Sequence, residues 1–138
     1  MKTKWWRYIL AIVTFLIADT VIPVLFGLVW SITSLFSPEY YRSSPSWTLL
    51  VSTILGTYAA IALADYIVQH SPKFIIIMCT VVAVVSIAVG VWNYALGNAQ
   101  LINMISMLVH GIVAIGYAIW RATTISSNEG NHHSEPIP

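Results

Sequence analysis

Residues 8–36 read YILAIVTFLIADTVIPVLFGLVWSITSLF, an apolar run with one acidic side chain, Asp19, deep inside it. A helix of this length can cross the hydrocarbon core of a bilayer, which takes about 20 apolar residues. Asp19 would then lie near the middle of the core, where an ionised carboxylate is costly and often functional. The rest of the chain is interpreted around this segment.

The composition predicts an integral membrane protein. The 138 residues are 58% hydrophobic and only 8% charged, and the mean hydropathy is +0.80. A soluble domain carries far more charge. The net charge of +1 offers no basic field for nucleic acid, so no nucleic-acid partner is expected. The single cysteine, Cys79, has neither a disulfide partner nor zinc-ligand neighbours, and we interpret it as a packing residue.

Four apolar segments are each long enough to span a bilayer: about 8–36, 47–68, 74–92 and 99–120. We expect all four to be helices, because lipid cannot satisfy the backbone groups of an open sheet. The sequence therefore predicts an all-α, up-and-down bundle of four transmembrane helices over residues 1–121. The polar stretch 122–138 is predicted to be a disordered cytoplasmic tail.

The distribution of basic residues predicts the orientation. With four spans, the two termini and the loop around Lys73 lie on one side, and Arg42 lies on the other. The first side carries the remaining cations: Lys2, Lys4, Arg7, Lys73 and Arg121. Because positive loops stay inside, both termini are predicted to be cytoplasmic, in a bacterial inner membrane or other plasma membrane.

Small residues mark the expected packing surfaces. In the second span a small residue recurs at every fourth position, which forms a ridge that another helix can approach closely: Ser52, Gly56, Ala60 and Ala64. We expect the chain to form a homo-oligomer, with this ridge as the contact between copies. Pro23 should kink the first span next to Asp19. Tyr58 joins Pro23, Gly56 and Ala60 as a candidate packing or gating residue.

Asp19 and His110 are predicted to meet. Asp19 lies twelve residues beyond Arg7, about 18 Å from the inner side, and His110 lies eleven residues before Arg121, about 16 Å from that side. The first and last spans of an up-and-down bundle with short loops are neighbours. Such a pair could bind and release a proton inside the membrane.

An alternative leaves Asp19 with a purely structural role. It would be neutral, or bonded to Thr20 or Tyr58, and would hold two helices together.

Asp65 lies near the inner end of the second span, within reach of four polar or aromatic neighbours: Tyr66, Gln69, His70 and Lys73. The favoured interpretation is an interfacial salt bridge, with the carboxylate reaching toward headgroup water. If Asp65 faces the bundle instead, it would form the cytoplasmic mouth of a path to Asp19.

Several kinds of chemistry have no signal in the sequence. It contains no glycine-rich phosphate loop, no histidine pair spaced to hold haem, no carboxylate cluster for a metal and no Ser-His-Asp set on a turn. His132 and His133 are adjacent but bring no further ligand. We therefore expect no enzymatic activity, no cofactor and no metal site.

Four short spans with a single acid in the first one resemble the small multidrug resistance transporters. In that family the membrane carboxylate alternates between a proton and a cationic substrate, and the protein works as a dimer. The resemblance implies transport coupled to the acid, although the family uses Glu where this chain has Asp19.

Two functions follow from these observations. The first is a small transporter, or the membrane component of one, with a protonatable midplane site at Asp19 and His110. The second is a non-catalytic accessory or assembly subunit, whose polar stripes dock onto a larger membrane complex.

Overall fold

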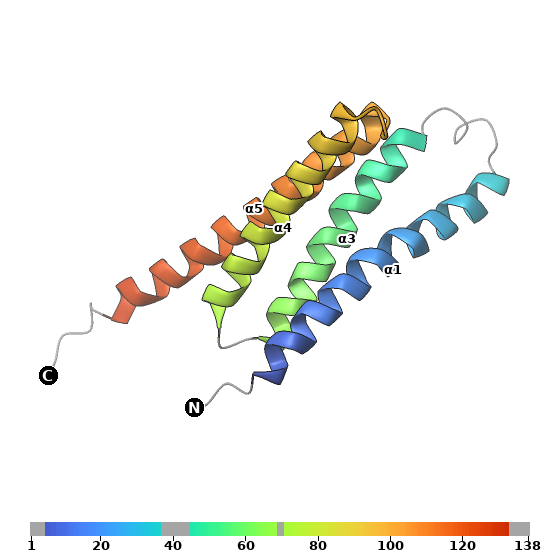
Figure 1. The fold of residues 1–138 in the computed structure, drawn as a ribbon. Helices are drawn as coiled ribbons and strands as arrows, with labels where there is room; N and C mark the ends of the chain where they lie inside the picture. The colour runs from blue at the N-terminus through green and yellow to red at the C-terminus, as the bar shows by residue number, and fades with distance from the viewer. Residues whose placement is uncertain (1–4, 37–44, 69–70, 133–138) are drawn as a thin grey trace, which may run out of the picture.

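The computed structural model describes residues 5–36, 45–68 and 71–132, and over these ranges it contains only helices and short turns. Helix α1 spans Trp6–Phe36, α3 Pro45–Ile67, α4 Pro72–Ala95 and α5 Leu101–His132 (Figure 1). Two helices begin at a proline, which suits the first helical position because no N–H donor is needed there. Gly97, with φ at +71°, turns the chain between α4 and α5.

Each helix contains a stretch long and apolar enough to cross a membrane: Trp6–Thr33, Thr48–Ile67, Pro72–Ala95 and Leu101–Ile125. The prediction of an all-helical protein with four such helices is confirmed. The first turn of α1 and the last turns of α5 lie toward the same end of the bundle (Figure 1), as an even number of alternating helices requires.

The helices are arranged as two antiparallel pairs, α1 with α3 and α4 with α5, which are joined mainly where α3 packs against α5. This corrects the expectation that the first and last helices pack side by side. In the α1–α3 pair, it is α3 and not α1 that packs extensively against α5. The reason is that α3 offers small residues on more than one face. Its span is the most buried of the four, at 39% of residues against 17% for α1.

The small-residue ridge of α3 packs inside the chain. Gly56 lies so close to α1 that a Cβ atom there would be 2.7 Å from Cγ of Pro23, and Ala60 and Ala64 are fully buried. The expectation that this ridge joins separate copies is therefore wrong. Because glycine has no side chain, α1 approaches closely here and covers the ridge with its own proline ring.

Helix α5 continues past the predicted end of the fourth span, to His132. The prediction of a disordered tail from residue 122 is therefore wrong up to residue 132, and residues 133–138 lie outside the described part of the chain. Extending an existing helix adds one hydrogen bond for each residue fixed. The hydroxyls of Thr123 and Thr124 also bond back to the carbonyl of Trp120, at 2.8 and 2.9 Å.

Replacing Gly56 with alanine should loosen the α1–α3 pair. The new methyl group would meet the rigid ring of Pro23, which cannot rotate away, and overpacking of this kind costs about 1–3 kcal/mol. Thermal unfolding of the purified protein, followed by circular dichroism, should show a lower Tm for Gly56→Ala. The matched control is Gly27→Ala, because nothing lies within 4 Å of a Cβ atom at Gly27. An equal loss in both variants would contradict the packing described here.

Candidate functional site

A polar cluster lies at the middle of the bundle, where side chains from three helices converge. Nε2 of His110 on α5 lies 3.7 Å from Oδ2 of Asp19 on α1. The hydroxyl of Thr57 on α3 donates to Oδ1 of Asp19 over 3.4 Å. The side chains of His110 and Asp19 are only 15% and 24% exposed. The structure thus brings together Asp19 and His110, which the sequence predicted to lie at the same depth, and adds Thr57.

The Asp19–His110 contact is a close approach without a formed hydrogen bond. At 3.7 Å the two atoms are beyond hydrogen-bonding distance, and the buried Nε2 of His110 has no hydrogen-bond partner. A buried polar atom without a partner costs about 1–3 kcal/mol. A small rotation of either side chain would close the gap, and a proton on the imidazole would then be shared with the carboxylate.

The two structural partners considered for Asp19 are used elsewhere. The hydroxyl of Thr20 donates to the carbonyl of Leu16 in its own helix at 2.9 Å. The ring of Tyr58 packs edge-on against Tyr117, with centroids 5.8 Å apart. Sequence reasoning missed Thr57, although it directly follows Gly56 on the close-packed side of α3 and is 1% exposed.

A second cluster holds Asp65 toward the inner end predicted for the bundle. Asp65 is only 8% exposed, and its Oδ2 accepts a hydrogen bond from the hydroxyl of Tyr117 at 2.9 Å. Nε of Arg121 lies 3.1 Å from the same oxygen, but its N–H is not directed well enough to form a hydrogen bond. The contact is therefore a close ion pair.

The structure contains a salt bridge at Asp65, as the favoured interpretation expected, but the direction of the side chain differs. The carboxylate faces the bundle and pairs with α5, rather than reaching out toward headgroups. The physical reason is that α5 presents an arginine and a tyrosine one turn apart on the face that packs against α3. Two of the neighbours first considered, Gln69 and His70, lie outside the described residues.

The α3–α5 contact is a parallel seam with regularly spaced polar groups. The hydroxyls of Thr53 and Ser106 lie 2.8 Å apart, and Asp65 meets Tyr117 further along. Ser106 lies 53 positions after Thr53, and Tyr117 lies 52 positions after Asp65. Two parallel helices produce such an almost constant offset. By the same offset Thr57 is level with His110.

Between the two acidic clusters the seam is apolar. By helical register, Ile61 and Ala64 of α3 and Ala114 of α5 lie between the levels of Asp19 and Asp65. All three are 0% exposed. Asp65 is therefore separated from Asp19 by a closely packed layer in this conformation.

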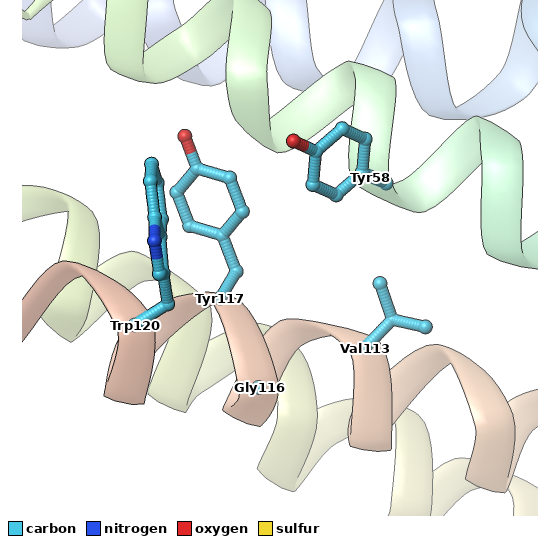
Figure 2. Close-up of a pocket in the computed structure, with 5 residues that line it drawn as sticks. All are labelled: Tyr58, Val113, Gly116, Tyr117 and Trp120. Carbon is cyan, nitrogen blue, oxygen red and sulfur yellow. The ribbon is translucent and has the colours of Figure 1, made fainter.

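An aromatic cavity of about 230 Å³ opens on the side of the same seam. Figure 2 shows the ring of Tyr117 from α5 between the ring of Tyr58 from α3 and the ring of Trp120 from α5. The remaining lining residues are Val113 and Gly116. Tyr117 contacts both neighbouring rings edge-on, at 5.8 and 5.3 Å between centroids. Tyr58 thus helps to hold the ring whose hydroxyl binds Asp65.

The described residues contain no group of three or more histidine, cysteine or acidic side chains that could hold a metal ion. Cys79 is 0% exposed and packs in the core. His132 ends α5, and His133 lies outside the described residues.

The fold and these clusters define the class of the protein: an all-helical chain with four helices long and apolar enough to span a membrane, and with two carboxylates held inside the bundle. Comparison with protein-family models, with curated protein sequences and with solved structures finds no match to this chain.

Removing the partner of Asp65 should destabilise the bundle. In Arg121→Ala the carboxylate would stay buried without its cation, a loss that typically costs 3–5 kcal/mol. We expect about 2–3 kcal/mol, because the Arg121 side chain is 23% exposed to begin with. Chemical unfolding of the purified protein measures the difference.

The double variant Asp65→Leu/Arg121→Leu should recover much of that stability, because it leaves no stranded charge. Lys73→Ala is the control for a lost cation at the same end of the bundle, since Lys73 is exposed. A double variant less stable than Arg121→Ala would contradict the assigned pairing.

Proposed function

We propose that the protein is integral to a plasma membrane, bacterial in the simplest case, with both termini cytoplasmic. We further propose that it is a small proton-linked transporter, or the membrane component of one, whose protonatable site is the Asp19–His110 pair. The observation that carries this proposal is the 3.7 Å approach of a carboxylate and an imidazole from two different helices inside the bundle.

The number of protons on the Asp19–His110 pair sets its net charge, and the apolar surroundings make a net charge costly. With one shared proton the pair is neutral overall, whichever residue carries it. Loss of that proton would leave a net negative charge in a medium of low dielectric constant, where an uncompensated charge is expensive. A solute cation entering as the proton leaves would restore neutrality. Proton–cation exchange is therefore the form of transport that this pair favours.

Thr57 supports the same proposal. Its hydroxyl donates to the carboxylate at 3.4 Å. A hydroxyl group can rotate to donate to an ionised carboxylate or to accept from a protonated one. The third helix thus supplies a contact that can follow the protonation state of Asp19.

One observation favours the accessory or assembly subunit instead. The packed layer of Ile61, Ala64 and Ala114 closes the seam between Asp65 and Asp19. A transporter must open a path to its site during its cycle, whereas a subunit that only docks onto a larger complex needs no such movement.

The substitution Asp19→Asn tests the proposal directly, because it keeps the shape of the side chain and removes the titrating group. Infrared difference spectra of the reconstituted protein between high and low pH should contain a protonated carboxyl component in the wild type that is lost in Asp19→Asn, while the components from the other acidic residues remain. In proteoliposomes with an acidic interior, at least one member of a panel of cationic, zwitterionic and anionic solutes should collapse the pH gradient through the wild type, and none through Asp19→Asn.

Thr20→Val is the matched control, because the Thr20 hydroxyl bonds to a carbonyl of its own helix and, among the described residues, makes no hydrogen bond to the carboxylate. This variant should retain the full response, whereas Thr57→Val should weaken it. A wild type that responds to no solute, together with an intact Asp19→Asn complex in pull-downs from native membranes, would favour the accessory subunit.

A further inference from the structure

We infer that the cleft between the start of α1 and the end of α3 binds the phosphate headgroup of an anionic phospholipid. The cleft is an open cavity of about 280 Å³ lined by Trp6, Arg7, Leu10, Tyr66 and Ile67. It is separate from the carboxylate clusters, and the inference rests on the proposed membrane location.

The charge in this cleft is uncompensated. Within the described ranges, no carboxylate lies within ion-pair distance of Arg7; the two ion pairs there involve His110 with Asp19 and Arg121 with Asp65. A guanidinium group left without an acid attracts phosphate, which it can bind through two parallel hydrogen bonds. Charge complementarity therefore indicates an anionic occupant.

The position of Arg7 is set by its neighbour. The guanidinium carbon lies 5.7 Å from the centroid of the Trp6 ring, a cation–π distance that holds the group at the rim of the cleft. Contact with the ring face leaves N–H donors at the edge of the guanidinium plane for a phosphate. Trp6 and Tyr66 are also the residue types that favour the headgroup level of a bilayer.

The cleft continues into an apolar surface that suits an acyl chain. Leu10 forms part of its wall, and Val13 and Ile17 follow at positions that share a helical face with Leu10. These three side chains are 42%, 44% and 58% exposed, respectively. A headgroup in the cleft would thus lie at the end of an apolar track toward the middle of the membrane. This pairing of phosphate site and track indicates a phospholipid rather than a free anion.

The experiment measures retention of phosphatidylglycerol by the full-length protein, titrated in phosphatidylcholine nanodiscs and followed by native mass spectrometry. Arg7→Gln should weaken binding of the most tightly held phosphatidylglycerol by about tenfold, the loss expected for one charged hydrogen bond. The affinity of Arg7→Lys should fall between those of the wild type and Arg7→Gln, because lysine keeps the charge but lacks the planar guanidinium group.

The matched control is Lys73→Gln, which removes one positive charge from the first turn of α4. This turn lies toward the same end of the bundle as the start of α1 (Figure 1), and Lys73 does not line the cleft. It should change binding less than twofold. Equal weakening by Arg7→Gln and Lys73→Gln would show general surface attraction and overturn the site. Displacement of the lipid by glycerol 3-phosphate at matched concentration would also overturn it, since a phosphate-ion site needs no acyl track.

Tyr66→Ala removes one wall of the cleft without a change of charge, and it should also weaken binding. It is the variant that tests the site if Arg7→Gln fails to fold. An unaltered titration in Tyr66→Ala would then contradict the inference. The result is independent of the transport proposal, because Arg7→Gln leaves the Asp19–His110 pair in place and Asp19→Asn leaves the cleft in place.

Discussion

Two carboxylates lie inside a largely apolar helical bundle, Asp65 buried and Asp19 half-buried, and the surrounding structure is arranged to make this possible. An acid in such a place needs an opposite charge, a hydrogen-bond donor or a proton, because the medium offers no water to stabilise it. Asp19 comes from α1 and Asp65 from α3, yet the groups that could carry the compensating positive charge, His110 and Arg121, both come from α5. The α3–α5 seam therefore organises the molecule.

The two acids are held differently, and the difference separates their roles. Asp65 has a close ion pair at 3.1 Å and a hydrogen bond at 2.9 Å, both from α5 and both on Oδ2, while its buried Oδ1 has no hydrogen-bond partner. Asp19 has a weak hydroxyl contact at 3.4 Å and an imidazole at 3.7 Å with an unpaired nitrogen. Arginine keeps its charge, whereas an imidazole can take up or release a proton, which is why we assign the proton-linked role to the Asp19–His110 pair.

The predicted site was partly correct because depth can be counted along a helix while lateral position cannot. Asp19 and His110 were matched by their distances from Arg7 and Arg121, and the structure places them 3.7 Å apart. The accompanying assumption, that α1 and α5 pack as neighbours, was wrong, because α3 lies against both of them. Their side chains meet across a contact that involves Thr57, which no spacing along one helix would reveal.

The sequence by itself determined that this chain forms four long apolar helices and that costly acids lie on two of them, because hydropathy and the rise per residue are local properties. Only the tertiary structure decided which helix covers the glycine ridge of α3, where a proline of α1 fits against Gly56. It also decided that Asp65 turns inward to Arg121. Inside a bundle of uniformly apolar helices, neighbours are chosen by close fit and by polar pairing across helices, and neither can be read from one helix alone.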